Sequence, residues 1–269
     1  MDKTKDYFNQ IAEDYDSSAD GKFVKRMYGE VVRQIMEIRP GTLLDLGCGN
    51  GNVLLAVGRQ YPACLYGLDI SEKMIAEAGK RLGELTAEGG GPDMQEKGGS
   101  SAAAIQKKGG GPAMQEKAGS PAAALPGKAG SSAAAMQESA GSSIAFRQET
   151  AGARCIDLRV GDAAALPYEN GFFDTVICNA SFHHYLNPGQ VLGEIRRVLK
   201  PGGTLVLGDP TAPFFLRPLL NTTFSARSSG DHHLYGKQEM IRLLKGAGFS
   251  VKKWKVIKLQ AFILTAERI

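Results

Sequence analysis

A glycine-dense segment is the first feature of the sequence whose residue types and spacing could do chemistry. Residues 45–51 read DLGCGNG and continue an apolar run that predicts a buried strand over 42–47. Glycine lacks a Cβ and adopts positive φ easily, so a ligand can approach the backbone closely there. The helix expected over 52–61 adds free N–H groups at its first turn. The segment therefore predicts a cradle for a ligand.

An acidic residue at the end of the next apolar run narrows the ligand class. Asp69 closes the run CLYGLDI, and a carboxylate there can accept hydrogen bonds from both hydroxyls of a ribose. Cradle and carboxylate together predict an adenosine-type ligand at the carboxyl ends of the strands. Asn52 stands where the dinucleotide fingerprint GxGxxG has its third glycine. This disfavours an NAD-dependent oxidoreductase, which stays an alternative.

Two pairs of adjacent histidines are candidates for proton transfer near neutral pH. His183 and His184 lie in SFHHYLNP, just beyond a predicted strand, and His232 and His233 lie in SSGDHHLY. The alternative for the first pair is a structural role, because adjacent side chains do not easily face one pocket. The alternative for the second pair is exposure in a loop. We expect no metal site, because no carboxylate-rich framework accompanies the histidines.

The elements that must position these residues alternate between strand and helix, which predicts an α/β fold with a mostly parallel sheet and helices on both faces. The final segment, 249–269, predicts two strands that close the sheet as an antiparallel pair. Apolar runs predict strands over 42–47, 64–70, 155–163, 173–181 and 203–210. Amphipathic patterns predict helices over 3–38, 52–61, 71–85, 189–199 and 237–248.

A low-complexity block interrupts this alternation. Of the 62 residues from Gly89 to Thr150, 34 are Gly, Ala or Ser, in repeated units such as GGGPDMQEK and GGGPAMQEK. Each unit has too few large apolar residues to bury a face, so we expect a disordered insertion rather than a solenoid. The alternative is a segment that binds a partner. Residues 1–88 and 151–269 are then expected to form one domain, with the insertion at the amino ends of the strands, opposite the ligand crevice.

Composition excludes several classes of protein. The 269 residues are 43% hydrophobic and 22% charged, as in ordinary globular proteins. We expect no membrane-spanning helix and no secretory signal at the polar start. The net charge of +4 is too small to predict a nucleic-acid partner. The cysteines have no CxxC spacing, which argues against a zinc knuckle or a disulfide scaffold and favours a reducing cytoplasm; they are Cys48, Cys64, Cys155 and Cys178.

Five segments in the same order carry a family resemblance. They are YFNQIAEDYD (7–16), DLGCGNG (45–51), GLDIS (67–71), VGDAAALPYENGFFDTVICN (160–179) and RVLKPGGTLVLGD (197–209). With them the chain resembles the class I S-adenosylmethionine-dependent methyltransferases, most closely the small-molecule group with the ubiquinone and menaquinone biosynthesis enzymes (methyltransferase type 11 domain). The resemblance implies a Rossmann-like, doubly wound, seven-stranded sheet with an antiparallel last strand. It also implies S-adenosyl-L-methionine as cofactor.

The resemblance implies roles for residues that match the family by position. Asp45, Gly47 and Gly49 would surround the methionine part of the cofactor, and Asp69 would hold the ribose. Tyr15, in the amino-terminal segment, would help to cover the cofactor. By residue type alone, Asp69 could instead cap the following helix and Tyr15 could pack against a helix.

A second group of matched positions would surround the adenine. Ile70 and Met74 would lie beside the ring, and Asp162 and Ala163 would meet its edge, with the carboxylate accepting from the amino group. Asn179 would lie where the fourth strand opens to the methyl-transfer site. By residue type alone, Met74 could belong to the core and Asp162 to a turn.

The resemblance implies an enzyme that transfers a methyl group to a small-molecule acceptor. Such an enzyme aligns the acceptor with the S–CH3 bond and excludes water, and it needs a base only if the acceptor must lose a proton. His183 and His184 are the catalytic candidates. The apolar stretch 211–224, with Phe214 and Phe215, predicts a cover over an apolar or aromatic acceptor. The alternative to an enzyme is a catalytically silent scaffold that binds the cofactor.

Overall fold

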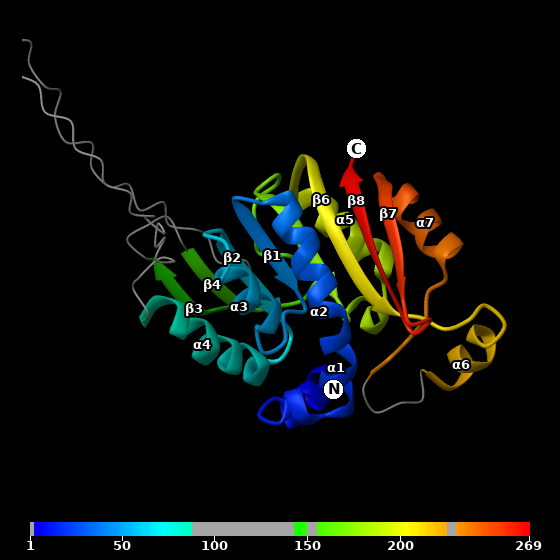
Figure 1. The fold of residues 1–269 in the computed structure, drawn as a ribbon, viewed down its shortest axis with the longest axis horizontal. Coiled ribbons are helices and arrows are strands. Elements are labelled where there is room, and N and C mark those ends of the chain that lie inside the picture. Colours follow the sequence, from blue (N-terminus) through cyan, green and yellow to red (C-terminus); the bar gives the residue numbers. More distant parts are fainter. Residues whose placement is uncertain (1–2, 88–142, 150–154, 225–229) are drawn as a thin grey trace, which may run out of the picture. The chain divides into compact units, whose positions relative to one another are not determined.

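One sheet organises the part of the chain that the computed structural model describes, residues 3–87, 143–149, 155–224 and 230–269 (Figure 1). Its strand order is β3-β4-β2-β1-β5-β6-β8-β7. The strands are β1 (Thr42–Leu46), β2 (Cys64–Asp69), β3 (Ser143–Glu149), β4 (Cys155–Val160), β5 (Phe173–Asn179), β6 (Leu199–Pro210), β7 (Phe249–Ile257) and β8 (Ala261–Arg268).

The strand directions confirm the predicted class. β4, β2, β1, β5 and β6 are parallel, whereas β8, the last strand of the chain, is antiparallel to both β6 and β7. These seven strands form the predicted Rossmann-like sheet. The chain leaves β1 toward β2 on one side and reaches β5 on the other side, so the crevice at the carboxyl end of β1 is the expected ligand site.

β3 is an eighth strand that the sequence analysis placed inside the insertion 89–150. It pairs antiparallel with the edge strand β4, and Ser143 lies opposite Val160. Its segment, SIAFRQE, contains Ile and Phe and no Gly, unlike the rest of the block, and this composition suits a strand. β3 begins at the carboxyl end of β4, at the ligand edge, and ends at Glu149 opposite Cys155, so the block 89–150 joins the start of β4 at the amino ends of the strands, as predicted. The predicted disorder of the remaining block lies outside the described residues.

Helices cover both faces of the sheet. They are α1 (Lys3–Ile11), α2 (Ala19–Ile38), α3 (Asn52–Gly58), α4 (Glu72–Ala87), α5 (Pro188–Val198), α6 (Arg217–Phe224) and α7 (Lys237–Gly246), with 3-10 turns η1 (Tyr15–Ser17) and η2 (Phe182–His184). The helical pattern predicted over 3–38 forms two helices, because the Ser18 side chain accepts the N–H of Gly21 at 3.0 Å and starts α2. None of the described helices is both long and apolar enough to cross a bilayer.

Alternation along the strands divides the core between the two faces of the sheet. Leu43 of β1 packs with α2, α3 and α4, whereas its neighbour Leu44 packs with α5 and α7. Successive strand residues point to opposite faces, so two adjacent leucines can serve both layers. Both residues are fully buried. The sheet is thereby held rigidly between two apolar layers, as a site at its edge requires.

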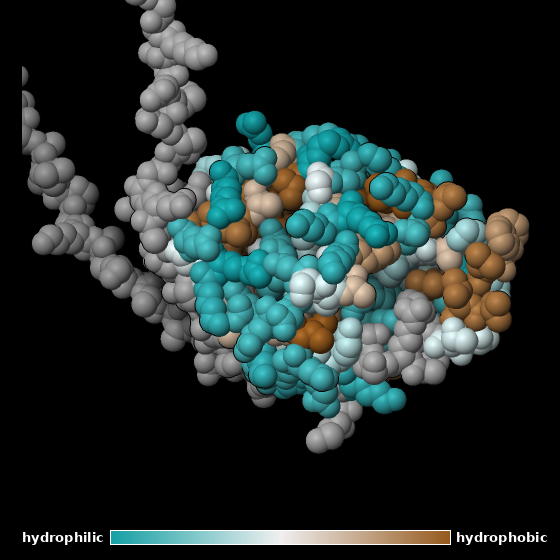
Figure 2. Space-filling model, turned by 60° about the horizontal axis from the view of Figure 1, so that its bottom comes forward, coloured by the Kyte–Doolittle hydropathy of each residue, from teal (hydrophilic) through white to brown (hydrophobic). Residues whose placement is uncertain are grey.

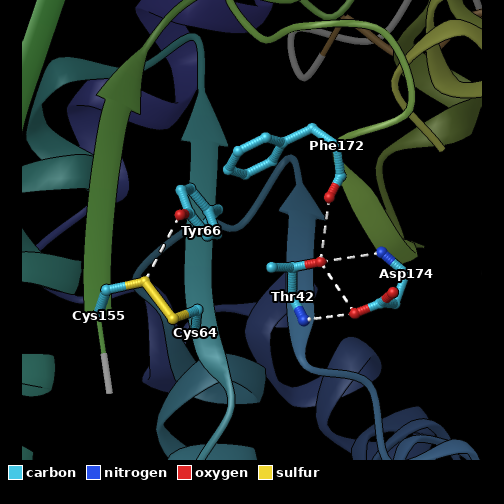
Figure 3. The surroundings of a disulfide bond; sticks show 6 residues. All are labelled: Thr42, Cys64, Tyr66, Cys155, Phe172 and Asp174. Atoms are coloured by element: carbon cyan, nitrogen blue, oxygen red, sulfur yellow. Dashed lines mark hydrogen bonds between the residues drawn. A yellow bond between two sulfur atoms is a disulfide. The ribbon is translucent and has the colours of Figure 1, made fainter. Parts of the chain in front are cut away.

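The amino ends of the strands are fastened together, as Figure 3 shows. A disulfide joins Cys64 at the start of β2 to Cys155 at the start of β4, with Cα atoms 4.6 Å apart. Asp174 of β5 accepts hydrogen bonds from the N–H and hydroxyl of Thr42 in β1, at 2.8 and 3.0 Å. The cysteine spacing, which argued against a disulfide scaffold, did not reveal this single pair. The reason is that parallel pairing brings together two strand starts separated by 91 residues, which local spacing cannot reveal.

Candidate active site

Three glycines with positive φ form the turn between β1 and α3, and they serve different purposes. A Cβ on Gly47 (φ 72°) would lie 2.5 Å from the Cβ of Ser181, so packing requires glycine there. A Cβ on Gly51 (φ 78°), which precedes α3, would lie 3.1 Å from that of Ala78. A Cβ on Gly49 (φ 52°) would meet no protein atom within 4 Å. The backbone at Gly49 therefore borders open space, as a ligand cradle requires.

Asp69 is held beside this turn by backbone hydrogen bonds. Its Oδ2 accepts the N–H of Gly49 at 2.8 Å, and its Oδ1 accepts the N–H of Ser71 at 2.9 Å. The Ser71 hydroxyl in turn accepts the N–H of Met74, so serine supplies the side-chain cap of α4. A carboxylate oxygen accepts more than one hydrogen bond, so both oxygens can still receive a ligand hydroxyl. Burial raises the pKa of Asp69, and the backbone N–H groups oppose that shift.

All ten predicted cofactor residues line one cavity of about 250 Å³ at the carboxyl ends of β1, β2, β4 and β5. Sequence reasoning thus selected positions that the fold brings together, although their individual roles stay predictions. Beside them the cavity is lined by several residues that sequence reasoning did not select, among them Thr4, Val24 and Tyr28. The ten are Tyr15, Asp45, Gly47, Gly49, Asp69, Ile70, Met74, Asp162, Ala163 and Asn179.

Asp45 is a second buried carboxyl group in this cavity wall, and its pKa is strongly raised. Burial, together with the charge of Asp69, raises the pKa of Asp45 to about 7. Only 2% of Asp45 is exposed. A cationic ligand group would favour the ionised form, because an opposite charge stabilises a carboxylate. The cavity thus offers two carboxylates to a ligand that carries positive charge and hydroxyl groups.

Asp162, which is predicted to meet the adenine edge, lines the cavity and also forms a turn. Asp162 lies in the cavity wall but is exposed, and its Oδ1 accepts the N–H of Ala164 at 2.8 Å, as in a turn. Asn179, at the end of β5, is buried, and its Oδ1 has no hydrogen-bond partner among the described residues. Buried polar atoms are normally paired, so this amide is a candidate to bind a ligand.

The amino-terminal segment closes one side of the cavity. Tyr15 of η1 is buried and clusters with Phe8 of α1 and with Met74 of α4. The Phe8 ring also meets His184 edge-on, with ring centroids 5.3 Å apart. Tyr15 therefore packs against helices, the alternative considered from residue type, and also lines the cavity. Both functions suit a lid.

A second cavity, of about 410 Å³, adjoins the first. His183, Pro210, Thr211 and Leu220 are among its lining residues, and it contains none of the ribose or methionine positions. Five residues line both cavities, and they mark the junction; they are Phe8, Tyr15, Val24, Ala180 and His184. Two ligands could therefore meet at this junction.

The adjacent histidines of η2 face one carboxylate. His183 Nε2 lies 3.5 Å and His184 Nδ1 lies 3.4 Å from Oδ1 of Asp231, and the two rings are 4.0 Å apart. The Nδ1 of His183 lies 2.9 Å from Oδ1 of Asp209, at the end of β6. Both histidines line the second cavity. The tight 3-10 turn thus brings together two side chains that the sequence alone suggested would diverge.

The buried surroundings give His183 and His184 very different pKa values. Burial opposes charge on His183, but the carboxylates of Asp209 and Asp231 outweigh it and raise the pKa of His183 to about 9. Burial and the neighbouring charge of His183 lower the pKa of His184 to about 3. Burial raises the pKa of Asp209 as well. At neutral pH the pair of His183 and Asp209 therefore holds one proton, and His184 is neutral.

Sequence reasoning missed these two carboxylates. Asp209 ends a predicted strand, so its position at the carboxyl edge was a usable signal. The sequence gives no such signal for Asp231, because its loop meets η2 only through tertiary contacts. One of them is the hydrogen bond from the N–H of His232 to the carbonyl of His183, at 2.9 Å. Of the second histidine pair, His232 lines the first cavity, whereas His233 bonds Glu239 at 2.9 Å, away from both cavities.

The predicted acceptor cover is partly misplaced. Phe214 and Phe215 are 77% and 66% exposed and line neither cavity. With Leu216 and Leu219 they form an exposed apolar patch on and beside α6, visible as brown atoms at the right of Figure 2. Leu220, one residue further along α6, faces the second cavity instead. Helical geometry thus turns only one side of α6 inward.

Comparisons with known proteins agree with this geometry. A family model described as a methyltransferase domain matches residues 21–253. A 37.1 kDa protein in transposon TN4556 of Streptomyces fradiae is 30% identical over 188 residues, covering 69% of this chain but 35% of that protein. The demethylmenaquinone methyltransferase of Thermotoga maritima is 25% identical, covering 91% of this chain and 86% of that enzyme.

A solved structure shares the fold over the whole chain. Magnesium protoporphyrin IX methyltransferase from Synechocystis PCC 6803, determined with bound SAH, has a TM-score of 0.60 at 18% identity, covering 100% of both chains. At that identity the likeness shows the fold alone. The family rests on the match over residues 21–253. The chain belongs to the methyltransferase-domain family, and it has the fold of the magnesium protoporphyrin IX methyltransferase.

Proposed function

We propose that this protein transfers a methyl group from S-adenosyl-L-methionine to a small-molecule acceptor. The observation that carries the proposal is the junction of two cavities, one lined by the cofactor positions and the other by a separate set of residues. Methyl transfer needs two ligands whose reacting atoms meet in line, away from water. A pair of cavities with a shared wall supplies this arrangement.

The residues of the first cavity fit the cofactor. Asp69 offers two held carboxylate oxygens to the ribose, and the open backbone at Gly49 leaves room for the chain beyond it. Asp45 offers a carboxylate to the amino group of the methionine part. When bound, S-adenosyl-L-methionine supplies a methyl group already activated by its sulfonium charge. The protein therefore has to bind the cofactor and the acceptor, orient them and shield the reacting atoms from water.

The residues at the junction would perform those tasks. Phe8 and Tyr15 would cover the reacting atoms and exclude water, and His184 would contact the acceptor. We propose His183 as a positioning residue that Asp209 holds in place. Neither imidazole is a strong proton acceptor at neutral pH, since His183 already carries a proton and His184 is a weak base. An acceptor that must lose a proton therefore needs further help.

The second cavity supports an acceptor with an apolar or aromatic body. Phe8, Phe23, Leu220 and Leu234 supply apolar walls. Arg26 and other polar groups also line this cavity and would orient a polar substituent. Such a cavity suits a small molecule better than a nucleic-acid strand, which requires an extended basic surface.

Calorimetry on the folded full chain tests the proposal. We expect heat with both S-adenosylmethionine and its demethylated product, none with NAD⁺, and at least tenfold weaker binding in Asp69→Asn. A metabolite extract supplied with labelled cofactor should then yield a methylated product that mass spectrometry identifies. Absence of heat with either sulfonium donor or product would overturn the proposal, and binding of NAD⁺ would favour the oxidoreductase alternative.

We propose the cytoplasm as the compartment. Cys48 and Cys178 are buried free thiols, which suits a reducing environment, whereas the disulfide between Cys64 and Cys155 opposes it. Acid trapping of whole cells, followed by alkylation of the unfolded protein and mass spectrometry, counts the free thiols and so distinguishes a reducing from an oxidising compartment. Four alkylated cysteines support the cytoplasm, and two contradict it.

A further inference from the structure

We propose that His183, His184 and Asp231 bind a divalent transition-metal ion of the Zn²⁺ class, with one coordination position open toward the second cavity. Each of the three residues offers one ligand atom, and these atoms all lie within 4.8 Å of one another. Nε2 of His183 and Nδ1 of His184 are the nitrogens that face Oδ1 of Asp231. The set joins two elements, η2 and the loop before α7. No described group outside it offers the same combination of donors.

Two of the distances between the candidate ligand atoms match the spacing in a coordination shell. The two imidazole nitrogens lie 3.5 and 3.4 Å from Oδ1 of Asp231. Ordinary N–H···O bonds are shorter, at about 2.7–3.2 Å. Ligand atoms about 2.1 Å from a tetrahedral Zn²⁺ are spaced by about 3.4 Å. The observed spacing therefore leaves the room that an ion between these atoms needs.

A buried nitrogen without a partner is the second, independent observation. Nδ1 of His184 has no hydrogen-bond partner among the described residues, although the side chain is only 8% exposed. Buried polar atoms are normally paired, so this nitrogen is a candidate to bind a ligand. A metal ion would satisfy this nitrogen.

Asp209 supplies the support that metal-binding histidines usually have. Its Oδ1 lies 2.9 Å from Nδ1 of His183, so that nitrogen is engaged and Nε2 points to Asp231. A carboxylate that accepts the other ring N–H fixes the tautomer and orientation of a metal-bound histidine.

The donor set indicates the class of metal and its use. Two imidazoles and a carboxylate resemble catalytic zinc sites with three protein ligands, whereas Mg²⁺ and Ca²⁺ prefer oxygen ligands alone. His183, His184 and Asp231 all line the second cavity, so the fourth position faces it. Only the following point rests on the proposed function: an acceptor hydroxyl, thiol or amine at that position would have its pKa lowered by the ion. This would supply the help that neither imidazole gives.

Titration of the chelator-treated full chain with ZnCl₂ tests the site. We expect one equivalent to bind, no competition from Mg²⁺, and binding at least 100-fold weaker in His184→Ala and in Asp231→Asn. Asp209→Asn, which leaves the ligands in place, should weaken binding about 10–100-fold. The matched control is His233→Gln, because His233 lies outside the cluster and bonds Glu239 instead. It should bind Zn²⁺ like the wild type.

Two results would overturn the proposal. One is the absence of Zn²⁺ uptake by the wild-type chain. The other is unchanged uptake in both ligand variants, which would assign the metal to other groups. If a ligand variant fails to fold, the Co²⁺-substituted wild type decides, because a cysteine site gives strong thiolate charge-transfer absorption and the proposed site does not. Binding of the demethylated cofactor, measured in parallel, separates failure of this site from failure of the proposed function.

Discussion

At the scale of single residues, the first cavity is defined by two buried carboxylates of unequal character. Asp69 is held by two backbone N–H groups, whereas Asp45 has a pKa near 7 because of burial and its acidic neighbour. A group with that pKa is half ionised at neutral pH. The charge of the cavity, and so its attraction for a cation, must change across the physiological range.

Asp45 makes cofactor affinity depend on pH. Binding of the cationic methionine part favours the ionised carboxylate, so at low pH a proton must first leave Asp45. With its pKa at about 7, affinity should fall as pH falls, by about tenfold between pH 8 and pH 6. Calorimetry with S-adenosylmethionine across this range measures the effect. Asp45→Asn should bind more weakly and without this slope, and a slope retained in that variant would place the titrating group elsewhere.

The residue scale also shows what a sequence can and cannot specify about this site. Gly49 and Asp69 could be predicted because Asp69 ends a recognisable apolar strand and Gly49 lies in the turn after another, and the carboxyl ends of parallel strands share one edge. The partnership of His183 with Asp231 could not be predicted. It depends on where a loop before α7 returns to η2, and no local pattern encodes that return.

At the scale of elements, the turn between β1 and α3 separates packing from binding. Gly49→Ala should cost only about 1 kcal/mol of stability, because its positive φ is the main strain. Its new methyl would project into the cavity, so affinity for the demethylated cofactor should fall at least tenfold. Gly47→Ala should cost about 2–3 kcal/mol, because the new Cβ also collides with Ser181. Urea unfolding and calorimetry together measure both effects, and equal stability losses would contradict this division.

The two sides of α6 allow a matched test of the acceptor cavity. Leu220 lines the second cavity, whereas the preceding Leu219 is 67% exposed. Leu220→Ala should raise the KM for the acceptor about tenfold, because one apolar side chain of that size is lost from the wall. Leu219→Ala should leave it unchanged, and neither variant should alter the KM for the cofactor. If both substitutions change the KM for the acceptor equally, Leu220 of α6 does not line the acceptor cavity.

Strand and helix patterns predicted most elements because apolar periodicity survives in any surroundings. These patterns did not predict an element boundary that depends on a single local contact. The cap that Ser18 provides divides the helical pattern of 3–38 into α1 and α2. β3 was hidden for another reason, since seven residues of strand composition follow a long repeat that dominates the local statistics. Pairing with the free edge of β4 then decides its structure.

At the scale of the whole molecule, the disulfide closes a loop of 91 residues that contains the insertion. Under the chain-entropy account, such a cross-link stabilises the fold by about 2–4 kcal/mol, because it restricts the unfolded chain. Cys155→Ala, unfolded in urea without reductant, should be less stable by that amount. Adding reductant should weaken the wild type similarly and leave the variant unaffected. Equal stability of the two proteins without reductant would show that β2 and β4 need no cross-link.

The insertion should be dispensable for cofactor binding, provided that β3 is retained. The expected path runs from the end of α4 to Ser143, which lies opposite Val160 at the ligand edge of β4, so the linker must span the height of the sheet. About ten Gly/Ser residues in place of 89–142 are long enough. Calorimetry should then find affinity for the demethylated cofactor within about threefold of the wild type, because the cavity walls come from outside the block. If the deletion variant folds cooperatively but no longer binds the demethylated cofactor, the repeats take part in the site. If binding is lost only when Ser143–Glu149 is also removed, β3 is the part that the site needs.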